Sequence, residues 1–198
     1  MKILDDLIFV LKGRDFRVKS VHTCVFWTAA ISKHCGLSST FRDERVPHDR
    51  HVRDVGDLTR KTALELAEYA KSKNLLEASI GMATVNSLID IDESRCIEKN
   101  AFEILLERGK EGIVAVVGHF PWVPKLREKV QNLWVLEERL REGDLPSTDA
   151  DRILPQCDVV GTTGTSFINH TLEGLLALSK KGFRRFDRYY FAPLVYSL

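Results

Sequence analysis

Three loops of this sequence combine glycine with polar side chains, as ligand-binding loops do. The first is Gly118-His119-Phe120-Pro121, the second holds Glu137, and the third runs from Gly161 to Ser166. Glycine lets the backbone turn sharply, and the start of a helix offers unpaired N–H groups to an anion. A carboxylate after the next strand is where dinucleotide folds contact a ribose hydroxyl. Because the chain has neither a G-x-G-x-x-G nor a Walker motif, the loops predict an anionic or heterocyclic ligand without indicating NAD or ATP.

The elements around these loops alternate between strand and helix in the second half of the chain. Continuous β-branched runs are typical of strands buried on both faces, and their alternation with helices predicts a Rossmann-like parallel sheet. Ligands bind beyond the carboxyl ends of such strands, so we expect the three loops to open onto one pocket. The predicted elements are helix 97–108, strand 112–117, helix 121–130, strand 133–136, helix 147–154, strand 157–162 and helix 166–179.

The first half has a different pattern, which predicts an α+β domain. Its helix 62–72 begins with Thr62 and Glu65 at the spacing of a capping box. We place the internal boundary in the polar segment 90–94, which gives domains 1–92 and 93–198. The other predicted elements are helix 3–11, a hairpin of strands 19–29 and 37–41, a charged surface loop 42–60 and helix 76–89.

Several histidines are candidates for metal binding or proton transfer. His119 follows a predicted strand, where it could act as a base, a metal ligand or a simple loop residue. His48 and His51 could bind a metal if their segment turned helically, with help from Asp43 and Asp54, although a charged exposed loop is the simpler interpretation.

One amide in the first half is also notable. Asn86 lies in an otherwise apolar helix, so we expect its amide either to be bonded between the two halves or to face a cleft.

Composition excludes several classes of protein. The 198 residues carry a formal net charge of +1, and the 44% hydrophobic and 29% charged fractions are those of a globular protein. The sequence contains no apolar run long enough to span a membrane, and acidic residues interrupt the N-terminal apolar stretch, so we expect a cytoplasmic protein. The four cysteines form no C-x-x-C pair, which argues against a zinc or redox motif.

Several segments together resemble the DUF364 family, which carries the label of heavy-metal chelation, and its preceding DUF4213 domain. The similarity runs from about residue 15 to 180 and is specific in combination. It is carried by ASIGMATVNS at 78–87, VVGHFP at 116–121, LE at 136–137, GDLP at 143–146, ILP at 153–155, DVV at 158–160 and TGTSFINHTLE at 163–173.

This resemblance implies an enolase N-terminal-like domain, then a Rossmann-like domain, with a site in the cleft between them. Phe120 would line that site within its motif. The positions that match family motifs are Gly81, Asn86, Gly118, His119, Glu137, Asp144, Gly164, Thr165 and Asn169.

Three functional hypotheses follow. In the first, the protein binds a small molecule or metal complex, Glu137 accepts a hydrogen bond from it, and His119 and Asp144 transfer protons or bind metal. In the second, a non-catalytic protein holds a metal ion through His119, Glu137 and Asp144, with His48 and His51 as further candidates. In the third, the chain is a scaffold with a degenerate pocket. Whether the protein is an enzyme stays open among these hypotheses.

The end of the chain departs from the family pattern. Residues 180–188 are basic and aromatic where the family continues with a buried strand, so we expect the C-terminus to be shortened or altered. An uncovered sheet edge there would allow self-association into a homo-oligomer. So short a basic patch is more often a solvated surface than a nucleic-acid contact, and we expect neither a nucleic-acid nor a membrane partner.

Overall fold

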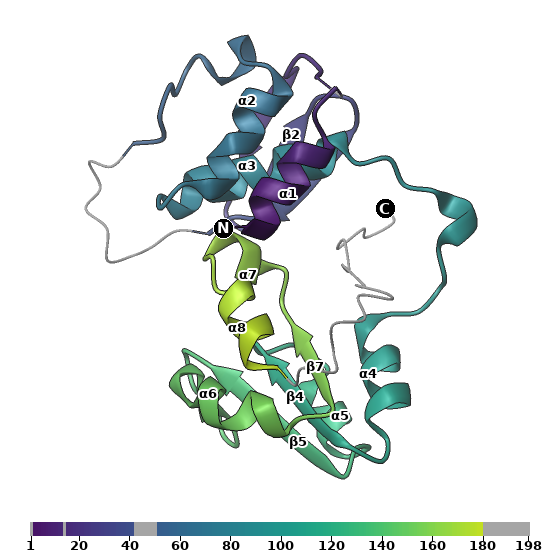
Figure 1. Ribbon diagram of the computed structural model, residues 1–198. Helices are drawn as coiled ribbons and strands as arrows, with labels where there is room; N and C mark the ends of the chain where they lie inside the picture. The colour runs from purple at the N-terminus through teal and green to yellow at the C-terminus, as the bar shows by residue number, and fades with distance from the viewer. Residues whose placement is uncertain (1, 14, 42–50, 180–198) are drawn as a thin grey trace. The chain divides into compact units, whose positions relative to one another are not determined.

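The computed structural model describes residues 2–13, 15–41 and 51–179, which form two units (Figure 1). Unit 1 holds the described part of Met1–Ser94 together with Thr165–Thr171. Unit 2 holds Arg95–Gly164 and the described part of Leu172–Leu198. Residues Thr165–Thr171 therefore belong to unit 1, although both of their flanking segments belong to unit 2.

Unit 1 packs helices against an antiparallel sheet with the strand order β1-β2-β3. Helix α2 begins with the predicted capping box, because Thr62 Oγ1 accepts from Glu65 N at 3.3 Å and Glu65 Oε2 accepts from Thr62 N at 2.8 Å. Its elements are α1 (Lys2–Val10), β1 (Ser20–Thr23), β2 (Trp27–Ile31), β3 (Cys35–Ser39), η1 (Leu58–Arg60), α2 (Ala63–Ala67), η2 (Glu68–Lys71), α3 (Leu75–Leu88) and α7 (Thr165–Ile168), and η3 (Glu93–Arg95) follows at the unit boundary.

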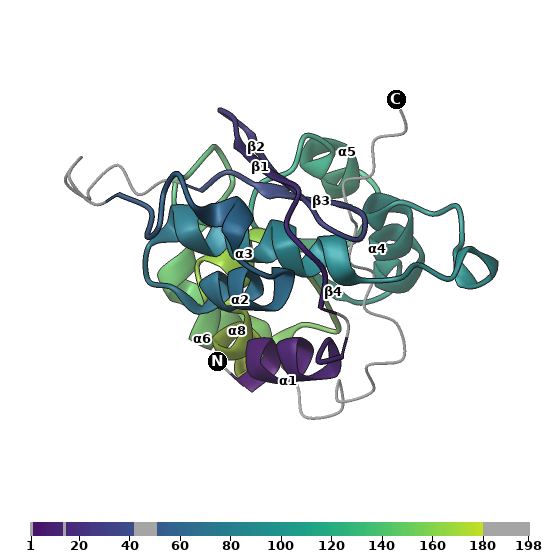
Figure 2. The same ribbon diagram turned by 90° about the horizontal axis from the view of Figure 1, so that it is seen from above.

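Helix α3 is the centre of unit 1 and is buried along most of its length. It lies beside α2 in both views of the ribbon (Figures 1 and 2). Two glycines permit close approach: a Cβ on Gly36 would lie 2.0 Å from Ala83 O, and one on Gly81 would lie 1.9 Å from Ala70 N. Backbone therefore packs directly on backbone, with β3 against one side of α3 and η2 against another.

Unit 2 is built on a parallel sheet with the strand order β6-β5-β4-β7. In β4, Val114 and Val116 belong to the apolar core with α4 and α5, whereas Ala115 belongs to the core with α6 and α8. Each face of the sheet is thus covered by helices, as the continuous apolar runs predict. Its elements are α4 (Ala101–Gly109), β4 (Ile113–Val117), α5 (Val123–Arg127), β5 (Asn132–Glu137), β6 (Leu145–Pro146), η4 (Ser147–Asp149), α6 (Ala150–Ile153), η5 (Leu154–Gln156), β7 (Val159–Thr162) and α8 (Leu172–Leu178).

The predicted fold class is confirmed, since an α+β unit with an antiparallel sheet precedes a parallel α/β sheet. The chain runs from β4 outward through β5 to β6 and then returns to place β7 on the other side of β4. This order puts a topological switch point between β4 and β7, where open α/β sheets bind ligands. Among the described helices, none is long and apolar enough to cross a membrane.

Two predicted elements are interrupted. The single strand expected over 19–29 is a hairpin of β1 and β2, closed where Cys24 N donates to Trp27 O at 2.9 Å. The helix expected over 166–179 is divided into α7 and α8, because His170 adopts a φ of 60° that ends the helical backbone. The predicted difference at the C-terminus, from residue 180 onward, lies outside the described residues.

Candidate functional site

The three predicted loops meet at the carboxyl edge of the unit 2 sheet. Gly118 N donates to Leu136 O at 2.9 Å, and Thr163 N donates to Val117 O at 3.1 Å, so each corner is hydrogen-bonded to the neighbouring strand. Gly118 has a φ of 99°, which favours glycine, and a Cβ there would lie 3.2 Å from Thr163 Cγ2. The loops after β4 and β7 therefore lie side by side at the switch point, and the loop after β5 lies on the other side of β4.

His119 and Asp144 form the central polar contact at this edge. His119 Nδ1 lies 3.0 Å from Asp144 Oδ2, and the side chains are 11% and 0% exposed respectively. Because an ionised carboxylate only accepts hydrogen bonds, Nδ1 carries the proton and donates it. When the imidazole is neutral, Nε2 is therefore the unprotonated nitrogen and presents its lone pair. That nitrogen is suited either to take a proton or to bind a metal ion.

A tight turn places Asp144 under His119. Asp144 N donates to Arg141 O at 3.0 Å, and Arg141 N donates back to Asp144 Oδ2 at 3.2 Å. Gly143, within the turn, has a φ of 80°, which residues with a side chain rarely adopt. The turn leads directly into β6, which pairs with β5 at Leu136 and Glu137. The sheet thus fixes the carboxylate through the strand that follows it.

The other carboxylate oxygen of Asp144 is buried and accepts no hydrogen bond within the described part of the chain. Its nearest ion-pair partner is Arg127, whose Nη2 lies 3.8 Å from Oδ1. The same Nη2 donates to Gly143 O at 3.2 Å. Reasoning from the sequence missed Arg127, because nothing in its local pattern links α5 with the turn at Gly143.

The predicted metal ligands His119, Glu137 and Asp144 do not assemble into a coordination shell. Among the residues that the structure describes, no three His, Cys, Asp or Glu side chains come together to hold an ion. The Asp144 side chain is fully buried and contacts His119 Nδ1. Glu137 Oε2 accepts from Glu138 N at 3.2 Å. The described residues therefore do not fit a resident metal ion, and His119 Nε2 is the donor that the His119–Asp144 pair can offer.

Other predicted ligand-binding residues of the second half have structural contacts. The Phe120 ring stacks on Trp122 with centroids 4.7 Å apart and belongs to the edge of the apolar core. Gly164 is exposed, and a Cβ there would meet no atom within 4 Å. Thr165 begins α7 in unit 1, and Asn169 Oδ1 accepts from Thr171 N and Oγ1 at 3.2 and 2.7 Å. The Asn169 amide thus closes the turn between α7 and α8.

Gly81 and Asn86 lie on α3 in unit 1. Gly81 is buried at the contact with Ala70 described above. Asn86 is exposed, and its Nδ2 donates to the Leu37 carbonyl at 2.8 Å. The Asn86 amide is therefore exposed and bonded to β3 of its own unit.

The predicted metal cluster around His48 is only partly described. Asp43 and His48 lie outside the described residues, and His51 is exposed. Asp54 instead binds Lys61 Nζ at 2.7 Å and accepts from the Tyr69 hydroxyl at 2.8 Å. The hydrogen bond from Lys61 lowers the pKa of Asp54 below its usual range, and burial raises the pKa of the Tyr69 phenol.

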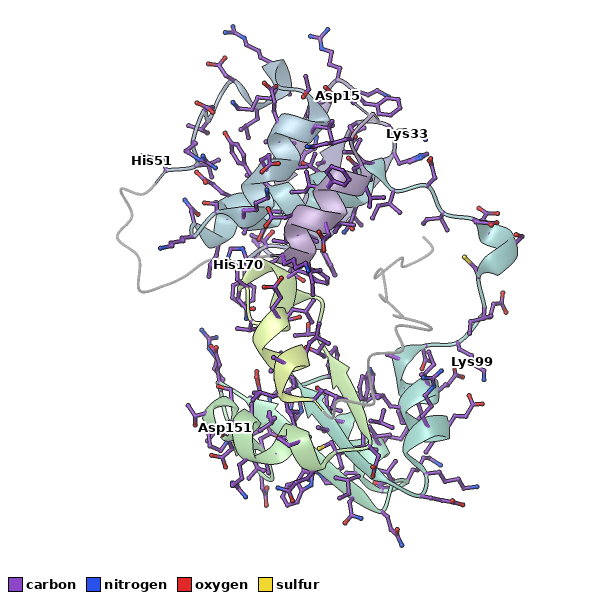
Figure 3. All side chains as sticks on the ribbon, in the orientation of Figure 1. Asp15, Lys33, His51, Lys99, Asp151 and His170 are labelled. Carbon is purple, nitrogen blue, oxygen red and sulfur yellow. The ribbon has the colours of Figure 1, made fainter. Side chains whose placement is uncertain are left out.

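A pocket of about 400 Å³ lies in unit 1, among polar side chains before β1 and α2. Two of its lining cations are in ion pairs, Arg60 with Asp57 at 3.0 Å and Lys61 with Asp54 at 2.7 Å, and Asp15 Oδ1 accepts from Leu64 N at 3.3 Å. Figure 3 shows Asp15 and Lys33 on this unit. The pocket is lined by Asp15, Phe16, Arg17, Arg60, Lys61 and Thr62.

Comparison with known proteins places both halves of the chain. The model of the DUF4213 family matches residues 5–89 and that of the DUF364 family matches residues 100–185, and each family is described as "Putative heavy-metal chelation". An uncharacterized protein of Methanocaldococcus jannaschii is 26% identical over 172 residues, which are 84% of this chain and 65% of that protein. This chain thus spans about two thirds of the length of that relative.

Two solved structures of the DUF364 family, both of unknown function, have a similar fold. The protein from Desulfitobacterium hafniense DCB-2 is 29% identical with a TM-score of 0.77, and the one from Pyrococcus horikoshii is 20% identical with a TM-score of 0.73. Each comparison covers 91% of this chain and 74% of the other.

Proposed function

Because the chain belongs to the DUF364 family, with a DUF4213 domain in its first half, we propose that it binds a small molecule or metal complex through unit 2. The binding edge is the carboxyl end of the β6-β5-β4-β7 sheet, and His119 is the side chain that meets the ligand. The pairing of His119 with the buried Asp144 carries this proposal, since it fixes an imidazole at the switch point of the sheet.

The neighbouring groups suit a polar ligand. The backbone at Gly118 and Thr163 brings two loops together, and Gly164 leaves open space beside them. Glu137 ends β5 and would accept a hydrogen bond from a ligand hydroxyl or amine. His119 Nε2 would take a proton from an N–H or O–H group, which makes Asp144 a positioning residue rather than one that touches the ligand.

In this proposal a metal ion is part of the ligand that the protein binds, which we call cargo, and is not a resident cofactor. A single imidazole nitrogen binds a free ion weakly, and the described residues bring no three His, Cys, Asp or Glu side chains together to hold one. We therefore expect an ion to arrive with a chelator that fills most of its coordination positions, leaving one for His119. The description of both families as heavy-metal chelation favours this version of the ligand.

Metal-stripped full-length protein tests the proposal by NMR of the histidine rings during two titrations. One probe is Ni²⁺ nitrilotriacetate, a chelate with open coordination positions, and the other is adenosine monophosphate, an anionic heterocycle. We expect at least one probe to perturb His119 at lower concentration than the exposed His22. The D144N variant should weaken that binding by about 10–100-fold, as loss of an outer-shell partner does at metal sites.

The matched control is H22A, which removes an exposed imidazole from unit 1 and should leave the His119 response unchanged. H119A should abolish binding of the probe. If neither probe binds His119 more tightly than His22, the proposed ligand site is wrong. Free Ni²⁺ that binds His119 as tightly as the chelate would overturn the cargo version alone.

A further inference from the structure

The two oxygens of the Asp144 carboxylate differ in the hydrogen bonds that they accept. Oδ2 accepts from His119 Nδ1 and from Arg141 N, whereas Oδ1 has no hydrogen bond in the described structure. The Arg127 guanidinium, which carries a permanent positive charge, lies 3.8 Å from Oδ1. A carboxylate that is wholly removed from water needs compensation of its charge, and Arg127 is placed to provide it.

Arg127 is held beside this carboxylate by a second contact. Its Nη2 donates to Gly143 O at 3.2 Å, so the guanidinium is bonded to the turn that carries Asp144. A Cβ on Gly143 would lie 3.4 Å from Arg127 Cζ, which shows how closely the guanidinium lies against the glycine backbone. The Arg127 side chain is 40% exposed, so only part of it packs against the turn.

We propose that Arg127 is a positioning residue that fixes the tautomer of His119 by acting through Asp144. This inference rests on the proposed function, in which His119 meets the ligand. The positive guanidinium lies against the carboxylate and its turn, the carboxylate Oδ2 holds the proton on His119 Nδ1, and Nε2 of the neutral ring keeps its lone pair. Arginine is suited to this role because its guanidinium stays charged and presents several donors in one plane.

The fixed tautomer also narrows the chemical class of the group that contacts His119. A lone pair at Nε2 accepts a hydrogen bond from an N–H or O–H group, or binds a metal ion. It repels a carboxylate or phosphate oxygen. We therefore infer that any anionic part of the ligand is bound by backbone N–H groups of the neighbouring loops, and that a donor or a metal ion faces the imidazole.

The nitrogen spectrum of the His119 ring tests the inference in the full-length protein, and it requires no ligand. At neutral pH the wild type should show a protonated Nδ1. R127M should move a measurable fraction of the ring to the Nε2-protonated form, and R127K should restore much of the wild-type pattern. K129M removes an exposed cation just beyond the same helix and should change nothing.

A double variant separates positioning from general disturbance. D144N should itself abolish the preference for Nδ1 protonation, and adding R127M to D144N should change the His119 signals no further. An R127M spectrum identical to that of the wild type, or an equal effect of R127M with and without Asp144, would overturn the inference. If R127M does not fold, R127Q, which also removes the positive charge, takes its place in the same comparison. Failure of the ligand titrations with these tautomer shifts intact would count against the proposed function alone.

Discussion

His170 Nε2 lies 2.8 Å from the carbonyl oxygen of Ala70, and 100 positions separate the two residues in the chain. Because a carbonyl only accepts, the imidazole donates through Nε2. Ala70 belongs to η2, and His170 follows α7, so this bond ties a late segment of the chain into the core of unit 1.

We expect H170A to lower the free energy of unfolding by about 0.5–1.5 kcal/mol, the usual net contribution of one hydrogen bond. The positive φ at this position disfavours alanine as well. H170N, which tolerates that backbone conformation, separates the two contributions. Urea unfolding followed by circular dichroism measures both variants, and an H170A protein as stable as the wild type would refute this assignment.

Gly81 tests whether a residue matched to a family motif serves packing. G81A places a Cβ 1.9 Å from Ala70 N, a contact that forces backbone to move. We expect G81A to lower the free energy of unfolding by about 1–3 kcal/mol or more, as overpacking of a core does. G174A is the matched control, because it lies in α8 with no atom within 4 Å of its Cβ and should stabilise the helix slightly. Comparable stabilities for the two variants would contradict the packing role.

Arg53 satisfies a buried carboxylate in unit 1. Arg53 N and Nε donate to Glu77 Oε1 and Oε2 at 2.7 and 2.9 Å, and the Glu77 side chain is 4% exposed. R53A should lower the free energy of unfolding by about 1.5–3 kcal/mol, because it removes a charge-assisted bond from a group that water cannot reach.

The control for R53A is R60A, which breaks an exposed ion pair with Asp57 and should change stability by less than about 1 kcal/mol. Chemical denaturation of both variants at neutral pH decides the matter. Equal effects would mean that Glu77 is satisfied by its remaining partners, the Arg53 backbone N–H and the Ser72 hydroxyl, without the guanidinium.

The pH dependence of stability should reveal the bond between Asp54 and Lys61. Lys61 lowers the pKa of Asp54 below its ordinary value of 3.8, so folding favours the ionised form. Its contribution is therefore complete above pH 3.8 and is lost as pH falls through the lower folded value.

We expect wild type to exceed D54N in thermal stability at neutral pH and the difference to shrink below pH 3.8. D57N, which alters an exposed pair, is the comparison for general charge effects. A difference between wild type and D54N that stays constant from neutral pH to pH 2 would exclude this ion pair as its source.

Patterns of burial explain why the main architecture was predictable. The β-branched run of β4 is buried on both faces, and a sequence of that kind has few alternatives to a central parallel strand. The β1–β2 turn was missed because Cys24, Val25 and Phe26 have no turn-forming residue type among them. The break at His170 was missed because neither its φ of 60° nor its bond to Ala70, 100 positions away, is visible in the local residue pattern.

The candidate site was predictable in part, because His119 follows a predicted strand and Asp144 matches a family motif. His119 and Asp144 were both singled out, and the structure brings their side chains within 3.0 Å. Neither the burial of Asp144 nor the role of Arg127 could be inferred, because both depend on how the turn before β6 folds back towards α5. Asn86 was expected to be bonded between the two halves or to face a cleft, because its helix is apolar, and the structure shows it exposed on α3 with its Nδ2 bonded to the Leu37 carbonyl.

The return of Thr165–Thr171 to unit 1 has a practical consequence for dissection of the protein. A polypeptide ending at Ser94 would lack Phe167 and Ile168, which are buried in the full chain. It would leave apolar surface uncovered and the Ala70 carbonyl without its imidazole donor. Cleavage of a single peptide bond therefore cannot separate unit 1 with all of its residues from unit 2. We expect limited proteolysis to release no intact N-terminal fragment.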